Sequence, residues 1–165
     1  CRGAAEASTR GHDVEVLVSA PPEPLEIVTD RERLRAALVN ILANAREAVL
    51  TRRADEARIV HAVAMGPAPR EGQPAERGPR EITVEVQQDP PGRVRVVVAD
   101  RGTGIAAEDL PRVFEPYYTT RRTGSGLGLA IARHIVEGLG GTIELASRHG
   151  EGTTVTIALP VDSRT

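Results

Sequence analysis

The stretch TGSGLGLAIARHIVEGLGG, from Thr123 to Gly141, restricts the fold more than any other part of this sequence. It places Gly124, Gly126 and Gly128 directly before an apolar pattern with helical spacing, and it ends on two further glycines. Glycine allows backbone torsions and close approaches that a Cβ atom would prevent. The free N–H groups of a helix N-terminus attract anions. The pattern therefore predicts a phosphate cradle before a helix from about 127 to 139, with a flexible hinge as the alternative.

The sequence contains no lysine, because all 21 of its basic residues are arginine. A P-loop requires the lysine of GxxxxGK[ST], and ordinary protein kinases require a lysine on a strand. Both common ATP sites are therefore excluded, and a nucleotide site in this chain must be built differently.

Composition argues against several other classes of partner. The formal net charge of −2 provides no positive field for nucleic acid or for a membrane surface. No segment approaches the ~18 apolar residues of a membrane-spanning helix. The single cysteine, Cys1, cannot form an internal disulfide. We expect a cytoplasmic domain that contacts neither nucleic acid nor membrane directly, within a parent protein that can itself be membrane-anchored.

A length of 165 residues corresponds to one domain. We expect residues 1–13 to be the end of an upstream linker, 14–160 to form the domain and 161–165 to be a tail. Proline and glycine recur between 52 and 80 without sustained periodicity, which predicts a flexible insertion there.

Periodicity predicts the order of the elements. A strand is expected at 14–20, and a capping box of Thr29 and Glu32 precedes the clearest helix. The apolar residues of that helix recur at helical spacing: Leu34, Leu38, Ile41, Ala45 and Val49. Alternation predicts two hairpins, 81–87 with 93–100 and 142–147 with 153–160, and a short helix is expected around 106–115. Because strands and helices do not alternate strictly, we expect a two-layer α/β sandwich with a mixed, mostly antiparallel sheet and helices on one face.

Two motifs carry candidate chemistry. Asn40, Asn44 and Glu47 fall on one strip of the predicted helix, beside its apolar stripe. Two asparagines inside a helix cost about half a kcal/mol each relative to alanine, which indicates either a ligand site or amides that hold a neighbouring loop. Asp100 ends a predicted strand before Gly102 and Gly104, which places a carboxylate at a tight turn. A plain turn is the alternative, and the context for a dinucleotide-binding fingerprint is missing.

Four segments in order resemble the boxes of sensor histidine kinases: NILANAREA the N box, DRGTGI the first glycine box, VFEPYYTTR the F box and GSGLGLAIARHIVEGLGG the second glycine box. The F box is most similar to that of nitrogen-regulation type kinases. The resemblance implies the ATP-binding catalytic domain of two-component signalling, with the Bergerat-type fold of the superfamily that also includes gyrase, heat-shock chaperone and mismatch-repair ATPases.

The resemblance also implies roles for individual residues. Asp100 would accept the adenine amino group, Asn44 would hold Mg²⁺, and Asn40, Asn44 and Arg121 would serve catalysis. Hydrolytic relatives place a glutamate where Asn40 stands, and an amide cannot take a proton from water, which favours phosphoryl transfer. The residues expected to bind ATP are Asn44, Glu47, Asp100, Gly102, Gly104, Ile105, Phe114, Thr119, Thr120, Arg121, Arg122, Gly124, Ser125, Gly126, Leu127, Gly128 and Leu129.

Glu47 departs from the family pattern, because many members have a basic residue three positions after the metal-binding asparagine. We therefore expect Arg121 or Arg122 to supply positive charge. The chain has four histidines, His12, His61, His134 and His149, and none lies in a helical-hairpin pattern.

The resemblance thus implies a catalytic fragment that transfers the γ-phosphate of ATP to a histidine on an upstream dimerisation domain. A response regulator would follow as acceptor, and the full-length protein would be a homodimer. Two rivals remain: a nucleotide-binding switch without phosphotransfer, and an ATP hydrolase or serine kinase of the same fold.

Overall fold

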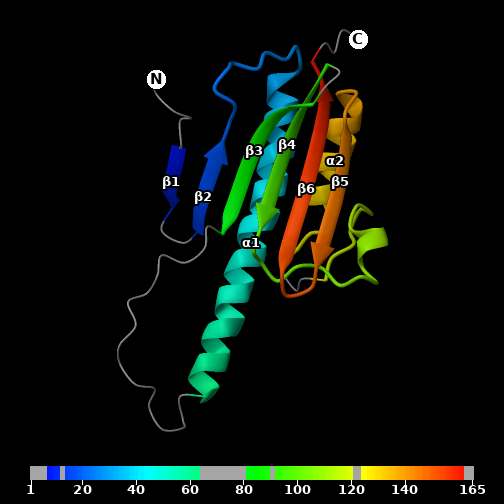
Figure 1. Cartoon of the computed structure of the whole chain (residues 1–165). Helices are drawn as coiled ribbons and strands as arrows, with labels where there is room; N and C mark the ends of the chain where they lie inside the picture. Colours follow the sequence, from blue (N-terminus) through cyan, green and yellow to red (C-terminus); the bar gives the residue numbers. More distant parts are fainter. Residues whose placement is uncertain (1–6, 12–13, 64–80, 90–91, 121–123, 162–165) are drawn as a thin grey trace.

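The chain forms one sheet with its helices on one face. The computed structural model describes residues 7–11, 14–63, 81–89, 92–120 and 124–161 (Figure 1). The strands are β1 (Ala7–Gly11), β2 (Val14–Ser19), β3 (Ile82–Asp89), β4 (Arg93–Asp100), β5 (Thr142–Arg148) and β6 (Gly152–Pro160). The helices are α1 (Arg31–Val63), the 3₁₀ turn η1 (Leu110–Arg112) and α2 (Gly128–Gly138).

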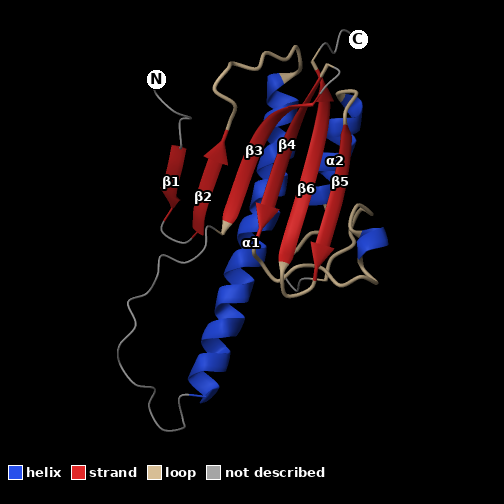
Figure 2. Ribbon diagram, viewed as in Figure 1, coloured by secondary structure: helices blue, strands red, loops and turns tan. Residues whose placement is uncertain are grey.

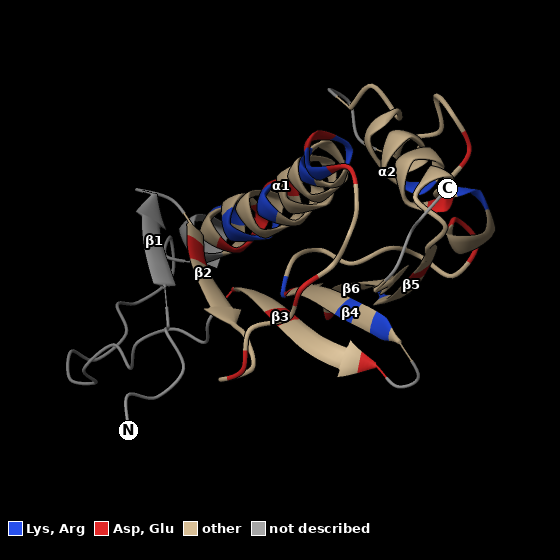
Figure 3. Cartoon of the chain, turned by 90° about the horizontal axis from the view of Figure 1, so that it is seen from above, with Lys and Arg blue, Asp and Glu red and all other residues tan. Residues whose placement is uncertain are grey.

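The six strands lie in the order β1-β2-β3-β4-β6-β5 (Figure 2). Only β2 and β3 pair in parallel, because α1 connects them, while the other four pairings are antiparallel. Seen from above, α1 and α2 cover the same side of the sheet (Figure 3). The predicted two-layer sandwich with a mixed, mostly antiparallel sheet is confirmed.

The core lies between the sheet and the two helices. Its largest fully buried side chains come from both layers: Ile41, Ile82, Val98, Val136, Ile157 and Leu159. The predicted apolar stripe of α1 faces this core, since Ile41, Ala45 and Val49 are buried and Leu34 and Leu38 pack against them. Within the part of the chain that the structure describes, no helix is long and apolar enough to cross a bilayer.

The N-terminus of α1 differs from the predicted capping box. The Asp30 carboxylate accepts the backbone N–H groups of Glu32 and Arg33, each at 3.0 Å. The Thr29 hydroxyl is instead buried without a hydrogen-bond partner among the described residues. An aspartate at the cap also suits the positive end of the helix dipole, so Asp30 replaces Thr29 in this role.

The prediction of a flexible segment is wrong for residues 52–63, because α1 continues through them. In Figure 1 this half of α1 projects beyond the sheet, so it needs no apolar stripe and leaves no periodicity in the sequence. Ion pairs stabilise it: Arg52 pairs with Glu56 at 2.8 Å, one helical turn on, and Arg53 pairs with Glu81 at 2.6 Å. Residues 64–80 of the predicted insertion lie outside the described residues.

The predicted linker also differs in part, because residues 7–11 form β1. This strand pairs antiparallel with β2 from Ala7 opposite Val18 to Gly11 opposite Val14. The backbone of β1 pairs with the N–H and C=O groups at the edge of β2, and this pairing does not depend on which side chains β1 carries. An alternation of apolar residues was therefore not required there.

Candidate functional site

One cavity of about 1020 Å³ opens where the sheet, α1 and the segment before α2 meet. The last residues of β4 and the first of β6 form its floor, and one side of α1 forms a wall. The long connection between β4 and α2 closes the other side. A volume of this size is typical of a small-molecule or cofactor site.

Most of the residues predicted to bind ATP or to serve catalysis line this cavity. They are Asn40, Asn44, Glu47, Asp100, Gly104, Ile105, Thr119, Thr120, Gly124, Ser125, Gly126, Leu127, Gly128 and Leu129. Sequence motifs at residues 40–47, 100–105 and 119–129 therefore meet around one space. The ligand contacts of these residues stay predictions.

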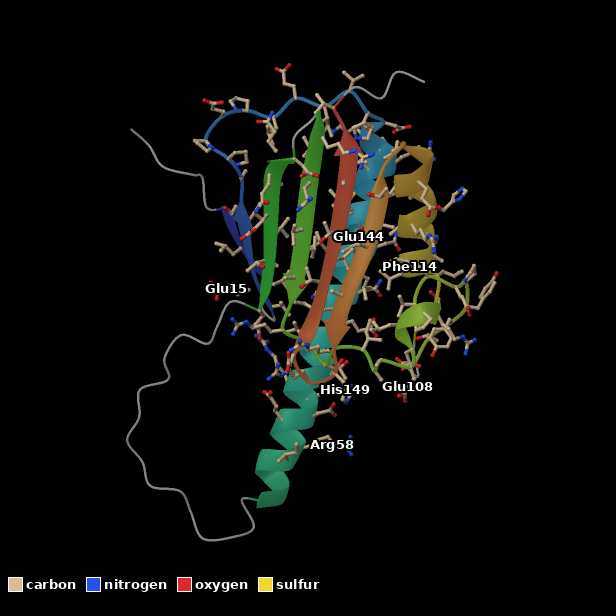
Figure 4. All side chains as sticks on the ribbon, turned by 45° about the vertical axis from the view of Figure 1, so that its right-hand side comes forward. Glu15, Arg58, Glu108, Phe114, Glu144 and His149 are labelled. Carbon is tan, nitrogen blue, oxygen red and sulfur yellow. The ribbon has the colours of Figure 1, made fainter. Side chains whose placement is uncertain are left out.

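Two predicted residues do not line the cavity, and two more lie outside the described residues. Gly102 lies behind Asp100, where an added Cβ would overlap Ala48 of α1. Phe114, labelled in Figure 4, does not line the cavity, and the centre of its ring lies 5.4 Å from the guanidinium carbon of Arg133 on α2. Nucleotide contact by these two residues stays a prediction. Arg121 and Arg122 lie outside the described residues.

The two asparagines of α1 face the start of α2. A Cβ on Gly128 would lie 3.0 Å from the Asn44 amide nitrogen and 3.5 Å from the Asn40 side-chain oxygen. The Asn40 amide nitrogen donates to the Ala36 carbonyl at 2.8 Å, which leaves its oxygen turned toward α2. Gly128 thus lets α2 begin close to both amides, and its unpaired N–H groups share the cavity with them.

A tight turn fixes the carboxylate at the end of β4. Asp100 Oδ1 accepts the backbone N–H of Gly102 at 2.8 Å, and the N–H of Thr103 donates to the Ala48 carbonyl at 3.3 Å. Gly102 has no room for a side chain between Ala48 and Asp100. The turn therefore orients a carboxylate at the cavity floor.

The close neighbour of Gly126 is protein backbone. Gly126 has φ +67°, and a Cβ there would lie 2.5 Å from the carbonyl carbon of Tyr117 and 2.7 Å from the oxygen of Tyr118. Its own carbonyl accepts the N–H of Tyr117 at 3.0 Å. This glycine brings the F-box segment against the start of α2. Protein backbone alone therefore excludes a side chain at Gly126, and the expected approach of phosphate to this glycine stays a prediction.

Tyr118 and Asp109 form a contact that the sequence did not predict. The Tyr118 hydroxyl hydrogen-bonds to the Asp109 carboxylate, and both residues line the cavity. The Arg112 guanidinium lies 4.1 Å from the centre of the Tyr118 ring and pairs with Glu115 at 3.0 Å. The hydrogen bond to Asp109 is the main cause that raises the pKa of Tyr118 above its usual value. These contacts hold the F-box segment to η1.

Sequence reasoning missed several other lining residues: Ala48, Thr51, Thr103, Ala106, Ile131, Leu145, His149, Thr153 and Val155. His149, labelled in Figure 4, lies at the turn between β5 and β6, in the connection of the predicted hairpin of 142–147 with 153–160. Leu145, Thr153 and Val155 read as ordinary strand residues, and no local pattern marks which strand end meets the glycine loops.

We expect Tyr118→Phe to speed amide exchange several-fold at Glu115, Tyr117 and Tyr118, whose backbone N–H groups are bonded in this turn. The ring remains, so folding should be little changed. Because the bond needs the phenol proton, wild-type protection should persist at neutral pH and fall as pH rises through the raised pKa. Hydrogen exchange with mass spectrometry measures both.

Tyr117→Phe is the matched control, since Tyr117 is 77% exposed. Equal exchange in the two variants would mean that the Asp109 contact does not hold the segment.

Comparison with known proteins identifies one family. The model of the histidine kinase-, DNA gyrase B-, and HSP90-like ATPase family matches residues 29–163. The chain is 37% identical over 151 residues to the sensor histidine kinase ZraS of Klebsiella oxytoca, covering 92% of this chain and 27% of that protein. It is 34% identical over 155 residues to the sensor-like histidine kinase SenX3 of Mycobacterium bovis, covering 90% of this chain and 30% of that protein.

A solved structure agrees with these matches. The mycobacterial sensor histidine kinase MprB superposes with a TM-score of 0.64 at 28% identity, over 90% of this chain and 82% of that one. The chain spans less than a third of the length of the curated relatives it matches.

Proposed function

This chain belongs to the histidine kinase-, DNA gyrase B-, and HSP90-like ATPase family, and we propose that it transfers the γ-phosphate of ATP to a histidine on a separate domain. The observation that carries the proposal is the meeting of Asp100, the two asparagines of α1 and the start of α2 around one cavity. Such a cavity has a carboxylate at one end for a base and helix N–H groups at the other for phosphates.

Asp100 is proposed to accept the amino group of adenine. Its carboxylate is held by the Gly102 N–H at the cavity floor, and the apolar side chains of Val98, Leu145 and Val155 line the space beside it. A planar base has apolar faces and a polar edge, so this surrounding suits it.

The phosphates are proposed to lie between α1 and the start of α2. The unpaired N–H groups of α2, an 11-residue helix, attract anions there. Arg121 and Arg122 are the proposed additional donors, because Glu47 lines the cavity where a basic residue would otherwise neutralise charge.

Mg²⁺ is the proposed metal, with Asn44 as its protein ligand. The Asn44 amide lies beside Gly128, on the phosphate side of the cavity. In the described part of the chain, no three His, Cys, Asp or Glu side chains gather as a metal centre. One side-chain oxygen fits a Mg²⁺ ion that takes its other ligands from phosphate and water, which is how this ion is commonly bound. When bound, Mg²⁺ neutralises charge that develops during phosphoryl transfer.

Asn40 favours transfer over hydrolysis. Its amide nitrogen is bonded to Ala36, and an amide cannot act as a general base for water. The chain's own contribution is then to position ATP and to hold N–H donors around its phosphates.

The proposed partners follow from the relatives. The chain spans only part of proteins named sensor histidine kinases, so the acceptor histidine is assigned to an upstream dimerisation domain of a homodimer. A response regulator is the proposed next acceptor.

The test combines this chain with the parent's upstream domain and ATP labelled at the γ-phosphate. We expect label on a histidine of the upstream domain, in a linkage that acid breaks and alkali does not. Free phosphate without labelled protein would indicate a hydrolase, and labelled serine would indicate a serine kinase. Nucleotide binding with neither product would leave a conformational switch.

We expect Asn44→Ala to leave the fold intact and to abolish the gain in ATP affinity that Mg²⁺ produces. The side chain is only half-buried, and its loss removes the proposed metal ligand. Calorimetry with ATP, with and without magnesium, measures this gain.

Val39→Ala, on the exposed side of the same helix, should respond to magnesium as the wild type does. If Asn44→Ala also keeps the full magnesium response, Asn44 holds the loop and does not hold the metal.

A further inference from the structure

Three polar residues form a row across the end of the sheet. Thr153 on β6 lies directly opposite Asp100 on β4 and opposite Ser147 on β5. Directly paired residues on antiparallel strands point to the same face. Thr153 and Asp100 line the cavity, whereas Ser147 does not. Thr153 is the one buried polar residue among the described residues, with 9% of its surface exposed.

The hydrogen bonds of Ser147 fix the direction of every proton in this row. Its oxygen lies 2.8 Å from the Gly152 carbonyl oxygen, which can only accept, so the single Ser147 proton goes there. The backbone N–H of Ile105 donates to the same Ser147 oxygen at 2.9 Å. The Thr153 oxygen lies 2.9 Å away. Since the Ser147 proton is already used, Thr153 must be the donor in this pair.

Ser147 is thereby saturated, with one bond donated and two accepted. The Thr153 proton points away from the cavity toward Ser147, and only lone pairs of the Thr153 oxygen remain for a ligand. Beside it stands a carboxylate, Asp100, which when ionised also accepts only. The cavity floor therefore offers acceptors and no side-chain donor at this row.

We propose that Ser147 is a specificity-determining positioning residue: by taking up the Thr153 proton, it makes the floor select a purine with a 6-amino group over one with a 6-carbonyl. An amino group donates to both acceptors, whereas a carbonyl oxygen would face them with lone pairs against lone pairs, and the neighbouring N1–H of a 6-carbonyl purine supplies one donor where the amino group supplies two. The inference rests on the proposed function, because it places the base of the nucleotide at Asp100.

Ser147→Ala frees the Thr153 hydroxyl to rotate and to donate into the cavity. The Thr153 hydroxyl can then donate to a 6-carbonyl, and it no longer always presents a lone pair to a 6-amino group. The variant also removes the partners of Ile105 N–H and Gly152 C=O, and that loss would weaken all nucleotides alike. The ratio of affinities therefore separates the proposed role from a merely structural one.

The experiment measures dissociation constants by calorimetry for ADP, for IDP, and for the diphosphate of purine riboside, which has no group at C6. For the wild type we expect ADP to bind best, purine riboside diphosphate next and IDP worst. The dissociation constant of IDP should exceed that of ADP about 100-fold. Ser147→Ala should reduce this ratio about tenfold, and IDP should no longer bind worse than the purine riboside analogue. Ser147→Thr, which keeps the hydroxyl, should restore the wild-type ratio.

An unchanged ratio in folded Ser147→Ala would overturn the inference, as would wild-type protein that binds ADP and IDP equally. Wild-type protein that binds no nucleotide would instead refute the proposed function. If Ser147→Ala does not fold, Thr153→Val tests the same inference, because it removes the acceptor itself. The ratio of the IDP and ADP dissociation constants should then fall, whereas Thr153→Ser should keep the wild-type ratio. An unchanged ratio in Thr153→Val would overturn the inference.

Discussion

Gly104→Ala is expected to lower the free energy of unfolding by about 3 kcal/mol, because two costs fall on the same residue. Gly104 has φ +65°, a conformation that L side chains rarely adopt. A Cβ there would also overlap the Arg148 carbonyl oxygen, with the Cα of His149 at 3.1 Å. The loop cannot withdraw freely, since Thr103 accepts the N–H of Gly150 at 2.7 Å. Thermal unfolding should show a midpoint lower by ~10 °C.

Gly92→Ala is the matched control for backbone strain alone. Gly92 has φ +68°, close to that of Gly104, but a Cβ there would meet nothing within 4 Å. We expect this variant to cost about 1 kcal/mol. If the two variants lose equal stability, the contact between Gly104 and the β5–β6 turn is not rigid. ADP affinity should fall in Gly104→Ala and stay unchanged in Gly92→Ala, because only the first glycine lines the cavity.

Asp100→Asn is expected to weaken ADP and ATP binding alike, by about 10- to 100-fold. A hydrogen bond to a carboxylate contributes about 1.5–3 kcal/mol, and asparagine presents a donor where carboxylate oxygen accepted. The fold should survive, since the asparagine oxygen can still accept the Gly102 N–H that Asp100 Oδ1 accepts at 2.8 Å. Equal losses for the two nucleotides are expected because the contact is with the base and not with the phosphates. Calorimetry gives both constants.

Asp89→Asn removes the same charge elsewhere in the sheet. Asp89 ends β3 and pairs with Arg95 at 3.1 Å, and it does not line the cavity. This control should bind nucleotides as the wild type does. Unchanged ADP affinity in Asp100→Asn would remove Asp100 from the base pocket.

Local periodicity predicted the fold class and most elements of the domain, although the short helix expected around 106–115 is only the 3₁₀ turn η1. The apolar spacing of Leu34 to Val49 and the alternation in β3, β4, β5 and β6 are set by which face of each element is buried. Where burial imposes no such pattern, prediction failed. The exposed half of α1 is held by ion pairs, and β1 is held by backbone bonds at an edge.

The motifs likewise indicated the cavity, because Asn40, Asn44, Asp100 and the glycines before α2 are unusual residues for their elements. What these residues touch was decided only by the tertiary structure. Position 126 requires glycine because the backbone of Tyr117 and Tyr118 packs against it and leaves no room for a Cβ.

Tyr118 meets Asp109 because η1 and the F-box segment fold back on each other. The direction of the Thr153 hydroxyl depends on Ser147, Gly152 and Ile105, which three separate parts of the chain supply. A sequence pattern records how each residue suits its own helix or strand. The partner of a polar group is set by strand register and by loops that pack across the sheet, so only the assembled fold determines it.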